Sequence, residues 1–286
     1  MCRRLASYVT PFLFAMASAC GCARNPLGAV REWAIVLSYE PQAHPVAASD
    51  LQRCQMVIVD PDSHPPLDGL GGKTIVVAYV SLGEAEEYRS YWPQIAQKEW
   101  VVGANENWGR SHFVDVRSAE WRSLVLETVV PGVIAKGFRG IMMDTLDTAD
   151  FLESKDPARF GGSRAAMAGL VHAIRERYPD LLLISNNGFA LFDKIGPCLS
   201  GALTESVFRR HGPKPGEYSA VSAEDADWKI SRLTSLAAKT GIPVFAIDYV
   251  SLGDVAGARD SAARLKALGF RPYIAERELN RIYRYE

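Results

Sequence analysis

Two acidic residues close short apolar segments and are candidates for catalysis. Asp144 ends the run GIMMD at 140–144, and Glu205 ends the run GALTE at 201–205. An ionised carboxylate at the end of a core segment is costly without a partner, so a chemical role is favoured over a purely structural one. Two carboxyl groups can hydrolyse a glycosidic bond, because one protonates the leaving oxygen while the other attacks the sugar carbon or activates water. We expect Asp144 to be the nucleophile or base and Glu205 the acid, with the exchanged roles as the alternative.

Further polar residues follow apolar segments and are candidates for substrate binding. For any single one, a helix cap or a loop hydrogen bond is the ordinary explanation. Their recurrence at the same position in successive segments favours one polar site. The expected substrate-binding residues are Asp60, Tyr79, Glu84, Asp147, Asn186, Asn187, Asp248 and Tyr249.

Other catalytic chemistries find little support in the motifs. The five histidines show no HxH or HExxH spacing, no GxSxG nucleophile motif occurs, and DGLGGKT has Leu67 where a phosphate loop needs its first glycine. We therefore expect no metal and no cofactor, with an all-carboxylate calcium or magnesium site as the alternative.

Eight apolar segments that alternate with helical patterns would position these residues. Because the segments are apolar on both faces, they predict parallel strands covered by helices. The segments lie at 33–39, 56–60, 74–81, 140–144, 181–185, 201–205, 243–249 and 271–275. The alternation predicts a single-domain (β/α)8 TIM barrel over 33–286, with an open doubly wound sheet as the alternative. In such a barrel the active site lies at the C-terminal ends of the strands.

The connecting segments predict helices and one elaborated loop. Apolar periodicity and glycine stop signals indicate helices at 118–136, 163–178, 222–239, 255–268 and 276–283. The long connection after the third strand, 85–117, predicts an elaborated loop. Its tryptophans, Trp92, Trp100 and Trp108, either stack on sugar rings or form a local core.

Composition narrows the class of protein. The 286 residues are 48% hydrophobic and 23% charged, with a formal net charge of −1. This balance is typical of a globular protein and shows no basic excess for binding nucleic acid. Cys54 and Cys198 are expected on opposite sides of the barrel, too far apart for a disulfide.

The N-terminal segment resembles an export signal. Arg3 and Arg4 precede an uncharged stretch that runs to Ala19 and is followed by Cys20. We expect a signal region at 1–22 and a linker at 23–32. Cys20 would be the lipidation site of a lipoprotein attached to a membrane, so the protein is expected to be exported, as a periplasmic or outer-membrane lipoprotein or as a secreted protein.

Taken in order, several sequence blocks resemble glycoside hydrolase family 114, the endo-α-1,4-polygalactosaminidase-like TIM barrels. The blocks are AYVSLGEAEEYRSYW, GFRGIMMDTLDTAD, ISNNG, LTESVF, FAIDY and GFRPYIAERELNRI. The resemblance implies cleavage of α-1,4-linked galactosamine or N-acetylgalactosamine polysaccharides. It implies that Asp144 and Glu205 are catalytic and that Asp60, Tyr79, Asn187 and Tyr249 line the sugar cleft. SLGEAEEY departs from the SAGSYE type of other members, which bears on substrate preference. A non-catalytic glycan-binding lipoprotein and a hydrolase of another glycan are the alternatives.

Overall fold

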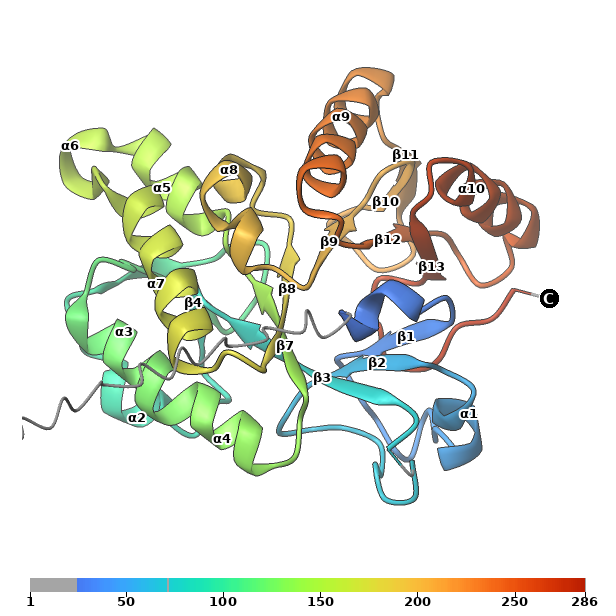
Figure 1. Ribbon diagram of the computed structural model, residues 1–286, viewed down its shortest axis with the longest axis horizontal. Coiled ribbons are helices and arrows are strands. Elements are labelled where there is room, and N and C mark those ends of the chain that lie inside the picture. The colour runs from blue at the N-terminus through green and yellow to red at the C-terminus, as the bar shows by residue number, and fades with distance from the viewer. Residues whose placement is uncertain (1–24, 71, 286) are drawn as a thin grey trace, which may run out of the picture.

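A ring of eight parallel strands forms the centre of the computed structural model, which describes residues 25–70 and 72–285. The expected signal region, with Cys20, lies outside the described residues. Neighbouring strands follow the order β1-β2-β3-β7-β8-β9-β12-β13 (Figure 1). Their bounds are β1 Trp33–Val36, β2 Met56–Val59, β3 Ile75–Ser81, β7 Gly140–Asp144, β8 Leu182–Asn186, β9 Gly201–Glu205, β12 Val244–Tyr249 and β13 Arg271–Ala275. The predicted TIM barrel is thus confirmed.

Side chains close the ring between its first and last strands. No backbone ladder joins β13 to β1 within the described ranges. Instead, the ring nitrogen of Trp33 donates to the carbonyl of Arg271 at 3.2 Å. The Trp33 ring also lies 5.3 Å from those of Phe245 and Tyr273, between ring centroids. Aromatic packing therefore completes the barrel.

Alternation along each strand divides the core into two layers. Met142, Ile184 and Leu203 belong to the buried cluster inside the barrel. Their neighbours Met143 and Leu183 belong to the cluster shared with the surrounding helices. Because side chains two residues apart point to the same face of a strand, the residue two positions after each inner one also points inward.

Helices surround the ring, and the longer ones match the sequence expectations (Figure 1). Two of the three longest helices have a recognisable start or stop signal: Ser222 caps the helix at Ala223–Thr240, Asp254 caps the helix at Val255–Ala267, and Gly241 ends the first of these with a φ of 73°. The α-helices are α1 Ala48–Gln52, α2 Trp92–Ile95, α3 Ala119–Leu124, α4 Val130–Ala135, α5 Thr148–Lys155, α6 Pro157–Phe160, α7 Ser163–Arg177, α8 Phe192–Ile195, α9 Ala223–Thr240 and α10 Val255–Ala267. Four shorter helical turns are η1 Pro26–Ala29, η2 Val125–Val129, η3 Phe189–Leu191 and η4 Gly196–Cys198.

The helix expected over 118–136 is a continuous helical stretch with one irregular turn. The turn η2, which joins α3 to α4, is a π-helix. Pro131 follows directly, in the first turn of α4. Proline has no backbone N–H and its ring crowds the preceding turn, so the wider turn relieves the conflict.

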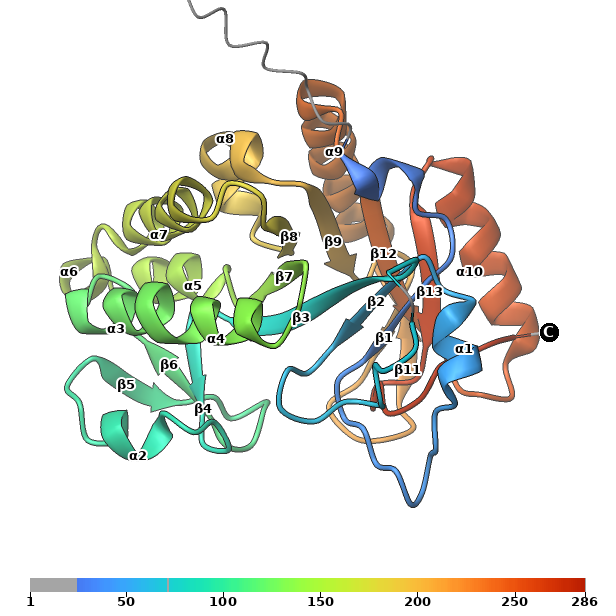
Figure 2. The same ribbon diagram turned by 60° about the horizontal axis from the view of Figure 1, so that its bottom comes forward.

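The elaborated loop after β3 is a small antiparallel sheet. It consists of β4 Glu84–Glu86, β5 Val101–Ala104 and β6 Ser111–Val114, in the order β4-β6-β5. Figure 2 shows this sheet beyond the end of β3, with α2 beside it. A second hairpin, β10 Arg209–His211 and β11 Tyr218–Ala220, follows β9.

The predicted helix at 276–283 is wrong. That segment has no helical residues, and the carbonyl of Leu279 accepts hydrogen bonds from Leu37 N at 2.8 Å and Ser38 N at 3.3 Å. Leu279 and Tyr283 are both buried, so their spacing of four imitates a helical face. Tertiary bonds to the loop after β1 override that local pattern.

Both cysteines in the described part of the chain, Cys54 and Cys198, are buried free thiols. Over residues 25–70 and 72–285, no helix is long and apolar enough to cross a membrane.

Candidate active site

One amide group joins the two expected catalytic carboxyl groups. The Nδ2 of Asn186, at the end of β8, donates a hydrogen bond to Asp144 Oδ1 at 2.8 Å and another to Glu205 Oε1 at 2.7 Å. Asp144 lies two residues after Met142, and Glu205 two residues after Leu203, so both point into the barrel mouth. Three neighbouring strands thus bring these side chains together.

The shared donor limits the separation of the two carboxyl groups. Their nearest oxygens can lie no further apart than the sum of the two hydrogen bonds to Asn186 Nδ2. This limit falls in the range of about 5–5.5 Å that separates the carboxyl groups of retaining glycosidases, below the about 6.5–9.5 Å of inverting ones. A separation within this limit is compatible with a pair that forms a covalent glycosyl intermediate.

Two more of the expected residues hold Glu205. The hydroxyl of Tyr249 donates to Glu205 Oε2, and burial followed by the charge of Glu205 raises the pKa of Tyr249 well above its usual range. Tyr249 therefore stays protonated and remains a donor. Behind Glu205, the side-chain oxygen of Asn187 accepts from Thr204 Oγ1 at 2.9 Å and from the backbone N of Glu205 at 3.3 Å.

The surroundings of Asp144 suit a residue that donates and accepts a proton. Burial, and next the negative charge of Glu205, raise the pKa of Asp144 from 3.8 to about 7. Tyr79 lies on the same inner face of the barrel, on β3. Burial and then the charge of Asp144 raise the pKa of Tyr79 well above its usual range, so it too is a neutral hydroxyl. A buried acid that titrates near neutral pH is suited to donating and accepting a proton in catalysis.

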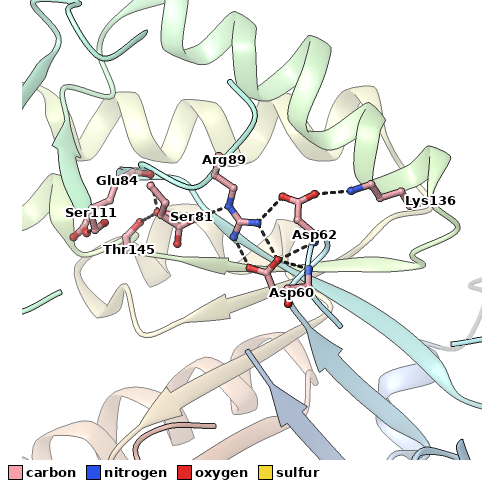
Figure 3. Close-up of polar contacts among 10 residues, drawn as sticks. Asp60, Asp62, Ser81, Glu84, Arg89, Ser111, Lys136 and Thr145 are labelled. Carbon is pink, nitrogen blue, oxygen red and sulfur yellow. Dashed lines mark hydrogen bonds and ion pairs between the residues drawn. The ribbon is translucent and has the colours of Figure 1, made fainter. Parts of the chain in front are cut away.

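The turn after β7 is pinned to the turn after β3, which fixes Asp144. The hydroxyl of Thr145 lies 2.8 Å from Ser81 Oγ and accepts from Gly83 N at 2.8 Å (Figure 3). The backbone of Leu82 donates to the carbonyl of Asp144 at 3.0 Å. A Cβ atom at Gly83 would lie 2.2 Å from the carbonyl oxygen of Thr145, so this close approach requires glycine.

Asp147 lies at the mouth of the site, exposed to solvent. The surrounding protein displaces part of its water, and Glu84 and Glu205 add negative charge, so the pKa of Asp147 is raised. This position, three residues after Asp144, is compatible with the expected contact to substrate.

Asp248 does not reach the site, which corrects the expectation of a substrate contact. It follows Ile247 and precedes Tyr249, both inner residues, so its side chain points outward to the helices. It is fully buried, and it accepts from Val207 N at 2.7 Å and from Ser261 Oγ on α10. Asp248 therefore holds the loop after β9.

The carboxylate of Asp60 also forms hydrogen bonds with other residues of the protein. Its Oδ2 accepts from Arg89 Nη2 at 2.8 Å, and its Oδ1 accepts from Arg89 Nη1 at 3.1 Å and from Asp62 N at 2.8 Å. Arg89 also bonds to Glu86 at 2.6 Å and to Asp62 at 2.8 Å, while Lys136 bonds to Asp62 at 2.6 Å (Figure 3). Asp60 thus belongs to a buried ion-pair network beside Tyr79, whose ring lies 5.8 Å from the Arg89 guanidinium. Its expected contact with the sugar stays a prediction.

The carboxylate of Glu84 also forms hydrogen bonds within the protein. Its carboxylate is buried and accepts from Asn105 Nδ2 at 3.0 Å, Ser111 Oγ at 2.6 Å and Thr148 Oγ1 at 3.2 Å. These bonds join the small sheet to α5. Glu84 therefore supports the loop after β3, and its expected role in the cleft stays a prediction.

The described residues contain no group of three or more histidine, cysteine or acidic side chains arranged to hold a metal ion.

Comparison with known proteins agrees with this geometry. The sequence model of glycoside-hydrolase family GH114 matches residues 16–286. The chain belongs to this family. The expected family, and a glycoside hydrolase as the class of protein, are thereby confirmed.

Relatives and solved structures extend the comparison for this GH114 protein. It is 28% identical over 276 residues to an uncharacterized protein of Deinococcus radiodurans, across 90% of this chain and 83% of the relative. The glycoside hydrolase domain of PelA from Pseudomonas aeruginosa has a TM-score of 0.75 and 25% identity, covering 88% of this chain and 96% of that chain. Ega3 from Aspergillus fumigatus, solved in complex with galactosamine, has a TM-score of 0.65 and 16% identity, covering 91% and 96%. The likeness to Ega3 supports the fold alone.

Sequence reasoning missed two contacts of this GH114 site. Lys229, on α9, donates to the carbonyl of Ser206 at 2.8 Å and to that of Glu205 at 3.4 Å, and burial lowers its pKa. The His211 ring lies 4.8 Å from that of Tyr249 and 6.1 Å from that of Trp108. Neither residue carries a local signal, because each meets the site through a tertiary contact.

Two of the three loop tryptophans lie in a local core. Trp92 stacks on His112 at 4.6 Å, and Trp100 packs 5.7 Å from the buried Trp121, so both form a local core. Trp108 is half exposed and lies over the guanidinium of Arg277 at 5.0 Å.

Proposed function

We propose that this GH114 protein hydrolyses α-1,4-linked galactosamine or N-acetylgalactosamine polysaccharides with Asp144 and Glu205 as the catalytic pair. The observation that carries the proposal is the single amide of Asn186 that binds both carboxyl groups. Placed this close, the two groups can act on opposite sides of one glycosidic bond. The amino-sugar substrate is what the sequence resemblance implies. Ega3, which has the same fold, was solved in complex with galactosamine.

The surroundings of the two carboxyl groups indicate which one donates the proton and which one attacks the sugar. With its raised pKa, Asp144 carries a proton and donates it to the leaving glycosidic oxygen. Glu205, which accepts from Tyr249 and Asn186, attacks the sugar carbon and forms a covalent glycosyl ester. Ionised Asp144 then takes a proton from water, whose oxygen cleaves the ester. This sequence retains the anomeric configuration and uses the alternative assignment of the two roles.

Acidic residues at the mouth suit a cationic chain. Glu205 and the exposed Asp147 give the cleft negative charge, which attracts a partly deacetylated polymer. This glycan would be met outside the cytoplasm, in keeping with the proposed export signal and with lipidation of Cys20 as the proposed mode of membrane attachment.

Polymer degradation tests the proposal. The purified protein is incubated with α-1,4-galactosamine polymer, its N-acetylated form and an α-1,4-glucan, and chain length is followed by mass spectrometry. We expect shortening of the amino-sugar chains, unchanged rates with a chelator, and retained configuration in the first product by NMR. Unchanged chain length for all three polymers, with binding intact, would instead indicate a glycan-binding protein without turnover.

A further inference from the structure

A groove lies along the turns after β7 and β8, the strands that end in Asp144 and Asn186. Its volume is about 340 Å³, and one helix, α9, forms its outer wall. The lining side chains that matter here are Asp147, Asp150, Phe189, Trp228 and Arg232.

An exposed aromatic ring forms one wall of this groove. Trp228 is 53% exposed, although α9 buries Ala226, Leu233 and Leu236 on its other side. The Trp228 ring lies 4.9 Å from that of Phe189, which is buried and fixes its position. A single exposed apolar residue is ordinary on a surface. The indole of Trp228, however, is held against Phe189 on the wall of a groove, and it therefore offers a flat face to the apolar side of a sugar ring.

The charges around the groove leave one free acid. Asp150 is paired with Arg164, and Arg232 donates to the carbonyl of Phe189 at 3.0 Å and lies 3.7 Å from Asp193. No side chain within residues 25–70 and 72–285 bonds to the carboxylate of Asp147. Asp147 can therefore accept hydrogen bonds from a ligand, most strongly from an ammonium group.

The groove adjoins the turns that follow Asp144 and Asn186. Asp147 follows Asp144 by three residues, and Lys229, next to Trp228 on α9, donates to the carbonyl of Glu205 at 3.4 Å. Asn187, which supports Glu205, directly precedes Gly188 and Phe189 at the floor of the groove. A polymer that crosses the carboxyl pair can therefore extend over Trp228.

We propose that this groove is an outer subsite that binds one amino-sugar unit of the polymer, with its ring on Trp228 and its ammonium group on Asp147. The inference rests on the proposed function, since it names where the same chain is held beyond the point of cleavage.

Calorimetry tests the subsite separately from turnover. In the Glu205→Gln background, Trp228→Ala should weaken the binding of an α-1,4-galactosamine hexasaccharide about tenfold, because the stacking surface is lost. Asp147→Asn should weaken the amine form more than its N-acetylated form. Phe151→Ala is the matched control, since Phe151 is 46% exposed on the neighbouring α5 but does not line the groove; it should leave binding unchanged.

Three results separate the subsite from the catalytic claim. Hydrolysis by the wild type together with unchanged binding by Trp228→Ala overturns the subsite alone. Weakened binding by Trp228→Ala, without hydrolysis by the wild type, supports the subsite and overturns the proposed function. Absence of both binding and hydrolysis overturns both.

Discussion

The hydroxyl of Tyr249 donates a hydrogen bond to the carboxylate of Glu205, and burial keeps that hydroxyl protonated. Tyr249 ends β12 and Glu205 ends β9, which pairs with it in parallel. The bond holds one oxygen of Glu205 while Asn186 holds the other. A carboxylate fixed at both oxygens keeps its orientation as the substrate binds.

Tyr249→Phe should lower kcat about tenfold to a hundredfold and change KM little. The reason is the loss of a hydrogen bond to a charged group, worth about 1.5–3 kcal/mol. Steady-state kinetics on amino-sugar oligosaccharides measures both constants. Tyr178→Phe is the control, because it loses a bond to the carbonyl of Leu126 in the helix layer; equal loss in both variants would contradict the role of Tyr249.

The pH dependence of activity should carry the titration of Asp144. The pKa of Asp144 is raised to about 7, so the protonated acid is present below that pH and disappears above it. We expect kcat/KM to fall about tenfold per unit at pH values well above 7. A rate constant that stays level from pH 6 to pH 9 would exclude Asp144 as the proton donor.

Asp144→Asn should make the folded protein more stable at pH 8. The pKa of Asp144 rises from 3.8 to about 7 on folding, so the stability linked to this group is present below pH 4 and is lost as pH rises through 7. The asparagine variant avoids that loss. We expect a gain of about 2 kcal/mol, less than the full shift implies because cleft water screens the charge.

Urea denaturation at pH 8 and pH 4 measures this difference. The gain should shrink toward pH 4, where wild-type Asp144 is neutral. Asp180→Asn, at an exposed position, is the control and should show no such change. A variant less stable than the wild type at pH 8 would contradict the pKa shift.

Arg89→Met should destabilise the fold by about 3–5 kcal/mol, because it leaves the buried carboxylates of Asp60 and Glu86 without a partner. Chemical denaturation provides the measurement. Arg110→Met removes an exposed pair with Glu87 and should change stability by about 0.5 kcal/mol or less. Similar losses in the two variants would refute a structural role for the Arg89 network.

The strand ends could be predicted from the sequence because each follows an apolar run of strand length. Asp144 and Glu205 were found this way, and they meet because the C-terminal ends of barrel strands share one rim. Asp248 could not be separated from Tyr249, since both faces of a barrel strand are apolar and the sequence does not show which residues point inward.

Contacts between segments that lie far apart in the chain could not be predicted from the sequence. Arg89 lies in the loop after β3, and nothing in its local pattern predicts an ion pair with Asp60 at the end of β2. Leu279 and Tyr283 have helical spacing, yet the backbone of the loop after β1 takes the Leu279 carbonyl as a hydrogen-bond partner. Tertiary bonding overrides local propensity at such places.

The most direct test of the catalytic pair is kcat/KM on α-1,4-galactosamine polymer for the wild type, Asp144→Asn and Glu205→Gln, with Asp180→Asn as control. We predict losses of about a thousandfold or more for the first two variants, because each removes one half of the acid–base and nucleophilic chemistry. The control should match the wild type. Activity within about tenfold of the wild type in either pair variant would contradict the account.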